Sequence, residues 1–324
     1  MTHPTPKGSP LFEIIFLGTS ASAPSIHRGL SAQIIIHNEH RFLVDCGEGT
    51  QRQILKSGLG FKRLNKILIT HGHLDHILGL AGLLSTLMRW EAMEEMEIFA
   101  GRWAMRRIHD LLHGVVLRGQ QPPVPLHLRE IGPGTLFEDD DFTVTAFPVD
   151  HRSPDCYGFL FEEKTRRPFL PEKAEALAIP PGPWRRDLVL GQAVSLPDGR
   201  VIEPDQVLGP PRLGTRFVHV GDVGRTDNLH EICRDADALV IESTYLDEEA
   251  DMADSFAHLT ARRAAELAQA TGVKHLFLTH ISRRYREREV IEEARSIFPN
   301  TFVVRDFDHF QVKRGECVKM ERES

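Results

Sequence analysis

The feature that most constrains this chain is a string of metal-binding residues, His71-Gly-His73-Leu-Asp75-His76, directly after a run of strand-forming residues. Residues 66–70 are apolar enough to predict a buried strand, and apolar side chains recur at helical spacing after His76. Three imidazoles and a carboxylate are therefore expected in a turn between a strand and a helix. A solvated histidine-rich turn is the weaker interpretation, because chance rarely places so many ligands in six positions.

Three further candidate ligands, His151, Asp222 and His280, lie far along the chain, each at the end of a predicted strand. Those strands are expected at residues 142–149, 216–220 and 275–279. Strand ends can bring side chains together at one edge of a sheet. Zinc accepts imidazole nitrogen and carboxylate oxygen, and a catalytic site keeps one position open to water. With the string at 71–76, these residues offer seven ligands, which is enough for two metal ions.

The remaining pattern predicts two β-sheets packed together with helices on their outer faces. Short strands are expected at 12–17, 33–36, 41–44, 157–161 and 238–242, and a helix at 259–271. The first three strands resemble an antiparallel meander. From about residue 162 to 214 the pattern breaks down into Pro, Gly and charged residues, which predicts an insertion that projects from the core.

Charge and composition narrow the function classes. The formal charge of −7 argues against a protein that coats nucleic acid nonspecifically. Residues 164–186 are a local exception, with six Lys or Arg residues against two Glu residues. The four cysteines are scattered singly, so we expect reduced thiols. No apolar run is long enough to span a bilayer and residues 1–10 lack a signal pattern, so we expect a cytoplasmic protein without membrane contact.

The ligand string, His151, Gly221-Asp222 and Thr279-His280 together resemble the metallo-β-lactamase superfamily. Other segments are similar to one of its families, ribonuclease Z, the tRNA 3′-processing endonucleases. These segments are Leu17-Gly-Thr19, Asp45-Cys-Gly-Glu-Gly-Thr50, Pro180-Pro-Gly-Pro183, Val207-Leu-Gly-Pro-Pro211, Glu242-Ser-Thr244 and His280-Ile-Ser-Arg-Arg-Tyr285. The resemblance implies a single α/β domain over residues 1–324, an αββα four-layer sandwich, with residues of about 162–214 inserted as a flexible arm.

The resemblance also implies a ligand assignment with two Zn²⁺ ions per subunit. The first ion would be held by His71, His73 and His151; the second by Asp75, His76 and His280; Asp222 would bridge them. Nitrogen and oxygen ligands also fit Mn²⁺ or another divalent ion. Asp45 and Glu242 resemble residues that orient ligating histidines, although Asp45 could equally be a turn aspartate.

The same resemblance implies a reaction and a substrate. His258, in Ala257-His-Leu-Thr-Ala261, is similar to the family's catalytic histidine, and Asp75 to a residue that orients the nucleophile. The substrate would be a tRNA precursor, cut to a 3′-hydroxyl tRNA and a 5′-phosphate trailer, by a homodimer. The candidate tRNA contacts are Arg28, Gly182, Pro183, Arg185, Arg186 and Tyr285.

The sequence departs from the family in the loop Pro24-Ser-Ile-His-Arg-Gly29, where Ile26 replaces a lysine and Gly29 an asparagine. Discrimination of the tRNA 3′ CCA end therefore stays open. The main alternative function is hydrolysis of a small molecule, which would need the same metals but no basic arm. A noncatalytic RNA-binding module is less favoured, because all seven ligands and His258 are present.

Overall fold

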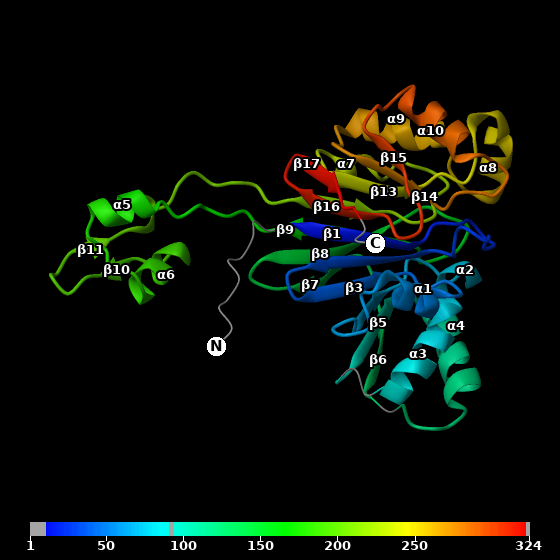
Figure 1. The fold of residues 1–324 in the computed structure, drawn as a ribbon, viewed down its shortest axis with the longest axis horizontal. Coiled ribbons are helices and arrows are strands. Elements are labelled where there is room, and N and C mark those ends of the chain that lie inside the picture. The colour runs from blue at the N-terminus through cyan, green and yellow to red at the C-terminus, as the bar shows by residue number, and fades with distance from the viewer. Residues whose placement is uncertain (1–10, 91–93, 123, 322–324) are drawn as a thin grey trace. The chain divides into compact units, whose positions relative to one another are not determined.

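The computed structural model describes residues 11–90, 94–122 and 124–321, and it contains two compact units. The larger unit, here called the body, comprises Met1–Glu162 and Thr215–Ser324. The smaller one, here called the insertion unit, is Glu163–Gly214. Figure 1 shows the two sheets of the body with helices on either side of them.

The first sheet of the body is built around the N-terminal meander. Its strands are β1 (Phe12–Gly18), β2 (Ala32–His37), β3 (His40–Val44), β4 (Lys66–Leu68), β5 (Met96–Ala100), β6 (Leu126–Glu130), β16 (His309–Lys313) and β17 (Glu316–Lys319). Their order is β17-β16-β1-β2-β3-β4-β5-β6. The pairs β1·β2 and β2·β3 are antiparallel, as predicted, whereas β3·β4, β4·β5 and β5·β6 are parallel.

The second sheet carries the later candidate ligands. Its strands are β7 (Gly134–Glu138), β8 (Phe142–Pro148), β9 (Tyr157–Glu163), β12 (Arg216–His219), β13 (Ala238–Glu242), β14 (Leu276–Thr279) and β15 (Thr301–Val303). Their order is β15-β14-β13-β12-β9-β8-β7. The run from β12 to β15 is parallel and β9 joins β12 in antiparallel fashion, with Glu162 opposite Arg216.

The helices of the body cover the outer faces of both sheets. They are α1 (Thr50–Ser57), α2 (Leu74–Ile77), α3 (Gly79–Trp90), α4 (Arg102–His109), the π-helix η1 (Asp110–Leu117), α7 (His230–Cys233), the 3₁₀ turn η3 (Asp247–Glu249), α8 (Ala250–Phe256), α9 (Ala261–Thr271) and α10 (Glu287–Arg295). Among the described residues, no helix has the length and apolar character that crossing a bilayer requires.

Three apolar clusters show how the layers pack. One joins α1, α3, α4 and η1 to the first sheet, and another joins α7, α9 and α10 to the second sheet. The third lies between the sheets and is rich in phenylalanine, including Phe16, Phe42, Phe159 and Phe277. Strands covered on both faces must be apolar on both, which explains why β13 and β14 are apolar up to their last residue. This is the expected four-layer α/β sandwich.

The insertion unit has regular structure of its own. It contains α5 (Pro171–Ala176), α6 (Pro183–Val189), the two-stranded sheet of β10 (Val194–Ser195) and β11 (Val201–Ile202), and the 3₁₀ turn η2 (Pro204–Gln206). Ala174, Ile179, Leu188 and Val207 form its small apolar core. The sequence pattern indicated only irregular chain here, because two-residue strands and helices of six or seven residues show almost no periodicity.

Several details of the body differ from the sequence prediction. The single helix expected after His76 is two helices, because α2 ends at Ile77 and α3 begins at Gly79. Asp75 and His76 consequently lie on α2, while His71 and His73 lie in the turn before it.

The four cysteines are free thiols, and Cys46, Cys156 and Cys233 are buried in the body, as expected.

Candidate metal centre

The strand register explains why distant candidate ligands meet. In the second sheet, the parallel pairing of β13 with β14 sets Glu242 opposite Thr279, so His280 leaves the sheet beside Glu242. In the first sheet, parallel pairing sets Val44 opposite Leu68, so Asp45 and the turn before His71 share one edge. Parallel strands end at the same edge of a sheet, and each sheet therefore presents its candidate residues together.

The first ligand group consists of His71, His73, His151 and Asp222, whose ligand atoms all lie within 4.8 Å of one another. The Nε2 atom of His71 is 2.9 Å from Nδ1 of His73, and Nε2 of His151 is 3.4 Å from that same Nδ1. The Oδ2 atom of Asp222 lies 3.8 Å from Nε2 of His71. Three ring nitrogens and one carboxylate oxygen therefore point to one place.

The second ligand group consists of Asp75, His76 and His280. The Nε2 atoms of His76 and His280 lie 3.7 and 3.4 Å from Oδ2 of Asp75. Both nitrogens also lie 3.4 Å from Oδ2 of Asp222. Asp222 thus stands between the two groups and contacts both.

The second nitrogen of each of three candidate ligands is held by a residue outside the cluster. Nδ1 of His76 lies 2.7 Å from the Asp45 carboxylate, and Nδ1 of His280 lies 2.9 Å from the Thr244 hydroxyl. Nδ1 of His151 lies 2.7 Å from the backbone carbonyl of Ala257. Such bonds fix the ring and the tautomer, so that Nε2 faces the cluster.

Two hydroxyl groups that the sequence analysis missed act in the same way. The Thr70 hydroxyl lies 3.1 Å from Nδ1 of His71, and the Ser153 hydroxyl lies 3.0 Å from Nε2 of His73. Thr70 also donates from its hydroxyl and its backbone N–H to the Asp45 carboxylate. Thr70 directly precedes the ligand string, and Ser153 follows His151 by two positions. Their polarity beside candidate ligands was the available signal.

The charges in the cluster fit a divalent cation. Burial alone would raise the pKa values of Asp75 and Asp222, but nearby histidines hold both well below the ordinary range, so both carboxylates are ionised. Burial lowers the pKa of His73 to about 4 and holds that of His71 well below its ordinary value, which keeps both rings neutral. Ionised carboxylates and neutral imidazoles are the ligating forms.

The surroundings of His76 also favour a cation. Burial opposes a charge on its ring, yet Asp222, Asp45 and Asp75 together raise its pKa well above the ordinary value. Its Nε2 atom is buried and has no hydrogen-bond partner. The carboxylates of Asp75 and Asp222 converge on this unpartnered nitrogen and form a natural cation site, because an unpaired buried charge is costly.

His258 is set apart from the ligands by its partner. Its Nδ1 lies 2.7 Å from Oε1 of Glu242, which also accepts a 2.8 Å bond from the Val223 N–H. Burial opposes its charged form, but the negative charge and hydrogen bond of Glu242 raise its pKa to about 9. The His258 ring stacks on His280 at a centroid distance of 5.5 Å. A protonated imidazole therefore faces the ligand cluster.

Two of the predicted substrate contacts in the body are occupied by internal partners. Arg28 donates to the Thr19 hydroxyl at 2.7 Å, to the Val304 carbonyl at 2.6 Å and to the Glu287 carboxylate at 3.1 Å. The Tyr285 hydroxyl donates to the Glu249 carboxylate. The structure shows both side chains stabilising loops of the body, so a role toward substrate stays a prediction for them.

The other predicted contacts lie in the insertion unit, around the start of α6. Gly182 has a φ of 124°, a conformation that essentially only glycine adopts, and Pro183 begins the helix. Arg185 donates two bonds to the Ile179 carbonyl, at 3.0 and 2.7 Å. Arg186 is exposed. The glycine turn and Arg186 are thus presented at the surface of this unit, whereas Arg185 is held within it.

Comparison with known proteins gives family matches over most of the chain. A model of the anti-Pycsar protein Apyc1 matches residues 12–167, and one of the beta-lactamase superfamily domain matches residues 207–281. Ribonuclease Z from Bradyrhizobium diazoefficiens is 44% identical over 93% of this chain and 100% of that protein. Ribonuclease Z from Archaeoglobus fulgidus is 38% identical over 94% of this chain and 99% of that protein.

Solved structures give the same picture. The short form of human tRNase Z matches with a TM-score of 0.64 and 27% identity, over 92% of this chain and 98% of that chain. The metallo-beta-lactamase fold protein YhfI from Bacillus subtilis matches with a TM-score of 0.65, over 94% of this chain and 100% of that chain. At 15% identity, the second match bears on the fold alone.

The packed sheets and the histidine and aspartate cluster at their edge define a hydrolase of the metallo-β-lactamase fold, with a site for divalent metal. Within that class the identity to several relatives over nearly their whole length is decisive. The chain belongs to the ribonuclease Z family.

Proposed function

We propose that this protein is an endoribonuclease that removes 3′ trailers from tRNA precursors. The products would be a tRNA with a 3′-hydroxyl and a trailer with a 5′-phosphate. The carrying observation is that seven candidate ligands and the His258–Glu242 pair converge at one edge of the sheets in a member of the ribonuclease Z family.

We further propose that the site holds two zinc ions, each on three ligands of its own, with Asp222 shared. Its position supports the shared role, because Oδ2 of Asp222 lies within 3.8 Å of nitrogens from both groups. Two bound divalent ions supply an activated water and neutralise charge on the phosphoryl oxygens during an in-line displacement. Manganese would fit the same nitrogen and oxygen atoms.

The side chains of the site divide the remaining work. Oδ2 of Asp75 accepts a 3.1 Å bond from the Ser22 N–H, which fixes the carboxylate that would orient the attacking water. His258 holds a proton, which it would donate to the ribose 3′-oxygen as that group leaves. Glu242 positions His258 and stabilises its charged form, and the Val223 N–H in turn fixes Glu242.

We propose that the insertion unit is the arm that binds the tRNA body. The exposed Arg186 and the adjacent glycine turn support this role. The positive charge is local, because the whole unit carries eight Lys or Arg residues against seven Asp or Glu residues. We therefore expect contacts to RNA shape and backbone near α6 rather than a uniformly basic surface.

From the resemblance to ribonuclease Z we also propose that the protein is a homodimer and that it acts in the cytoplasm.

The direct test is cleavage of a 3′-extended tRNA precursor, with and without its CCA end. Purified wild type is compared with Asp222→Ala and with metal-stripped wild type. We expect cleavage after the discriminator base, lost in both controls. The CCA comparison shows what Ile26 and Gly29 do. Absence of tRNA cleavage together with intact metal-dependent hydrolysis of a generic diester would contradict the proposal.

The alternative of small-molecule hydrolysis can be separated by removing the insertion unit. Glu162 already pairs with Arg216 across β9 and β12, so a short Gly-Asn turn can replace residues 164–214 and close a hairpin. We expect tRNA cleavage to fall at least a hundredfold while hydrolysis of bis(p-nitrophenyl) phosphate is retained. Equal loss of both activities in a folded variant would refute the arm role, and unchanged tRNA cleavage would favour a different contact surface.

A further inference from the structure

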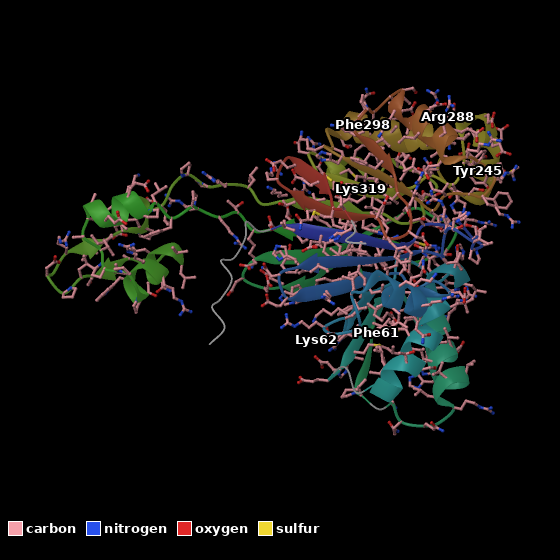
Figure 2. All side chains as sticks on the ribbon, in the orientation of Figure 1. Phe61, Lys62, Tyr245, Arg288, Phe298 and Lys319 are labelled. Atoms are coloured by element: carbon pink, nitrogen blue, oxygen red, sulfur yellow. The ribbon has the colours of Figure 1, made fainter. Side chains whose placement is uncertain are left out.

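A strongly basic segment of the body has no part in the function proposed above. Between Glu48 and Asp75 the chain carries five cationic side chains and no carboxylate, although the protein as a whole has a charge of −7. Three of the five, Lys62, Arg63 and Lys66, line one pocket. Figure 2 labels Lys62 and its neighbour Phe61. Phe61 is buried, whereas Lys62 is exposed.

This pocket, here called the basic pocket, has a volume of about 490 Å³. Its charged lining residues are Arg41, Lys62, Arg63, Lys66, Glu39 and Glu94. It lies where β3 and β4 begin, at the sheet edge opposite the metal centre. Lys66 and His71 are five positions apart in nearly extended chain, a distance of roughly 16 Å. A ligand in the basic pocket would therefore not occupy the reaction site.

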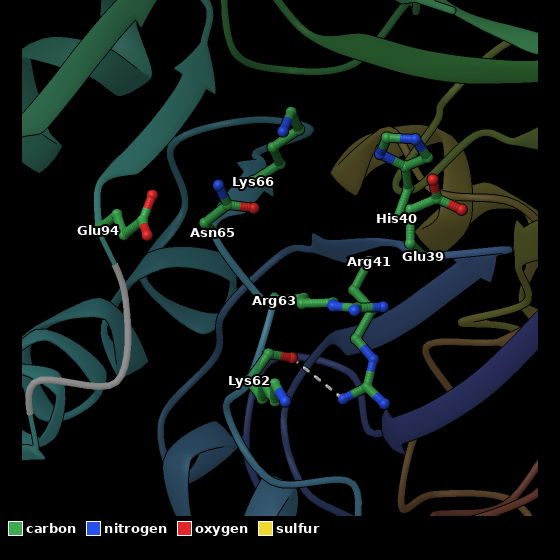
Figure 3. Close-up of a pocket in the computed structure, with 8 residues that line it drawn as sticks. All are labelled: Glu39, His40, Arg41, Lys62, Arg63, Asn65, Lys66 and Glu94. Carbon is green, nitrogen blue, oxygen red and sulfur yellow. Dashed lines mark hydrogen bonds between the residues drawn. The ribbon is translucent and has the colours of Figure 1, made fainter. Parts of the chain in front are cut away.

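Two cations of the basic pocket, Arg41 and Lys66, are positioned by contacts other than ion pairs with the described residues. Arg41 donates to the carbonyls of Leu59 and Lys62, at 3.0 and 3.2 Å, as Figure 3 shows for the bond to Lys62. The Lys66 ammonium lies 5.5 Å from the Phe137 ring centroid. Within the described chain, Lys62 and Arg63 contact no carboxylate. The pocket thus keeps four positive charges together, and none of the described carboxylates forms an ion pair with them.

Two further observations support a built site. Arg63 adopts a φ of 64°, an uncommon conformation for a residue with a side chain, and such strain is often found where a ligand binds. His40 also lines the pocket, and its Nε2 lies 3.0 Å from Oδ2 of Asp139, so the Asp139 carboxylate contacts the histidine. Glu39 and Glu94 oppose the four cations only in part.

We propose that the basic pocket is a second anion site, which binds a ligand carrying at least two phosphate groups. Guanidinium and ammonium donors are the groups that recognise phosphate oxygens. The volume is within the range of small-ligand sites. The same chemistry is offered by a free nucleoside polyphosphate and by a stretch of RNA backbone, and the experiment below separates these sources.

The test is titration calorimetry of inorganic triphosphate into the full chain. Lys62→Glu and Arg63→Glu are compared with the wild type and with Arg106→Glu, an exposed residue of α4 that undergoes the same change of charge. We expect binding to weaken about tenfold or more in the first two variants and to stay unchanged in the control. Repeating the titration in Asp222→Ala separates binding at the metal centre, and the pocket's binding should persist there.

A competition arm identifies the source of the phosphates. Displacement of triphosphate by a short single-stranded RNA supports the proposal with RNA backbone as the natural ligand. Triphosphate binding that such RNA does not displace supports it with a free polyphosphate. Equal triphosphate affinity in all folded variants, or no binding that survives Asp222→Ala, overturns the proposal.

Discussion

Histidines within a few ångströms of one another differ here in their balance of burial and neighbouring charge. Burial, with neighbouring imidazoles, keeps His71 and His73 neutral, whereas Glu242 overcomes burial at His258, which holds a proton. The sequence could predict the candidate ligands that the structure brings together, because each stands in a recognisable motif or after a predicted strand. It could not predict Thr70 or Ser153, because a hydroxyl takes its role only from the tertiary contact.

Replacement of His258 should separate catalysis from metal binding. His258→Ala should lower kcat about 10²- to 10⁴-fold, because the leaving oxygen loses its proton donor. The metal content of His258→Ala should match that of the wild type. The control His230→Ala, which changes an exposed histidine of α7, should also keep the wild-type metal content. Single-turnover cleavage and metal analysis measure both quantities. A parallel loss of metal would assign His258 to the ligand set instead.

His219 should make folding stability depend on pH. The ring is buried, its Nε2 donates to the Gln33 side chain at 2.6 Å, and burial lowers its pKa to about 4. The unfolded chain takes up a proton near pH 6.5 but the folded chain does not until about pH 4, so stability is lost as pH falls between those values.

The expected contribution of His219 is about 3 kcal/mol across that window. Denaturant unfolding at several pH values should show a flatter profile for His219→Gln, which keeps a donor for Gln33. Because His71 and His73 also have lowered pKa values, only the difference between the two proteins counts. Identical pH profiles would contradict the assignment.

At the scale of elements, central strands were more predictable than edges. Strands ending at candidate ligands were expected within one or two residues of their observed bounds, because burial on both faces gives clear apolar runs. The edge strands β6, β7 and β17 were missed, since their exposed positions break that pattern, and the interior strands β5 and β16 were missed as well. The junction of α2 and α3 was missed because the apolar spacing continues through it.

That junction depends on a close approach of two backbones. A Cβ atom at Gly79 would lie 2.0 Å from the carbonyl oxygen of Gly47, in the loop that follows Asp45. Gly79→Ala should therefore lower the free energy of unfolding by about 1–3 kcal/mol, although alanine usually favours a helix.

Gly114 is the matched control for Gly79. It lies in η1, and a Cβ atom there would meet no atom within 4 Å. Gly114→Ala should leave the unfolding free energy unchanged or raise it by up to about 1 kcal/mol. Chemical denaturation of both variants measures the contrast. Similar unfolding free energies for the two variants would mean that the loop containing Gly47 shifts easily to make room for the added methyl group.

On the scale of the whole molecule, the ligands link chain segments far apart in sequence. His71 to His76 come from the first sheet, whereas Asp222 and His280 come from the second. A metal ion that binds only the folded protein stabilises the folded state by about 4 kcal/mol when the free metal concentration is a thousandfold above Kd. Stripping the metal should therefore lower the melting temperature by several degrees.

Differential scanning calorimetry with and without a chelator checks this expectation. Asp222→Ala, which lacks the shared carboxylate, should show a much smaller chelator-dependent shift. A wild-type melting temperature that does not respond to the chelator would mean that the site is rigid without metal and adds nothing to global stability.

The insertion unit also bears on the order in which the chain folds. Strands β9 and β12 pair side by side, but about fifty residues separate them, and closing so long a loop costs entropy. Within the insertion unit, Arg166 bridges to Arg212 and Phe169 to Leu208. We therefore expect early collapse of this segment to bring the two strands together as a hairpin, so that the insertion unit would hasten assembly of the second sheet.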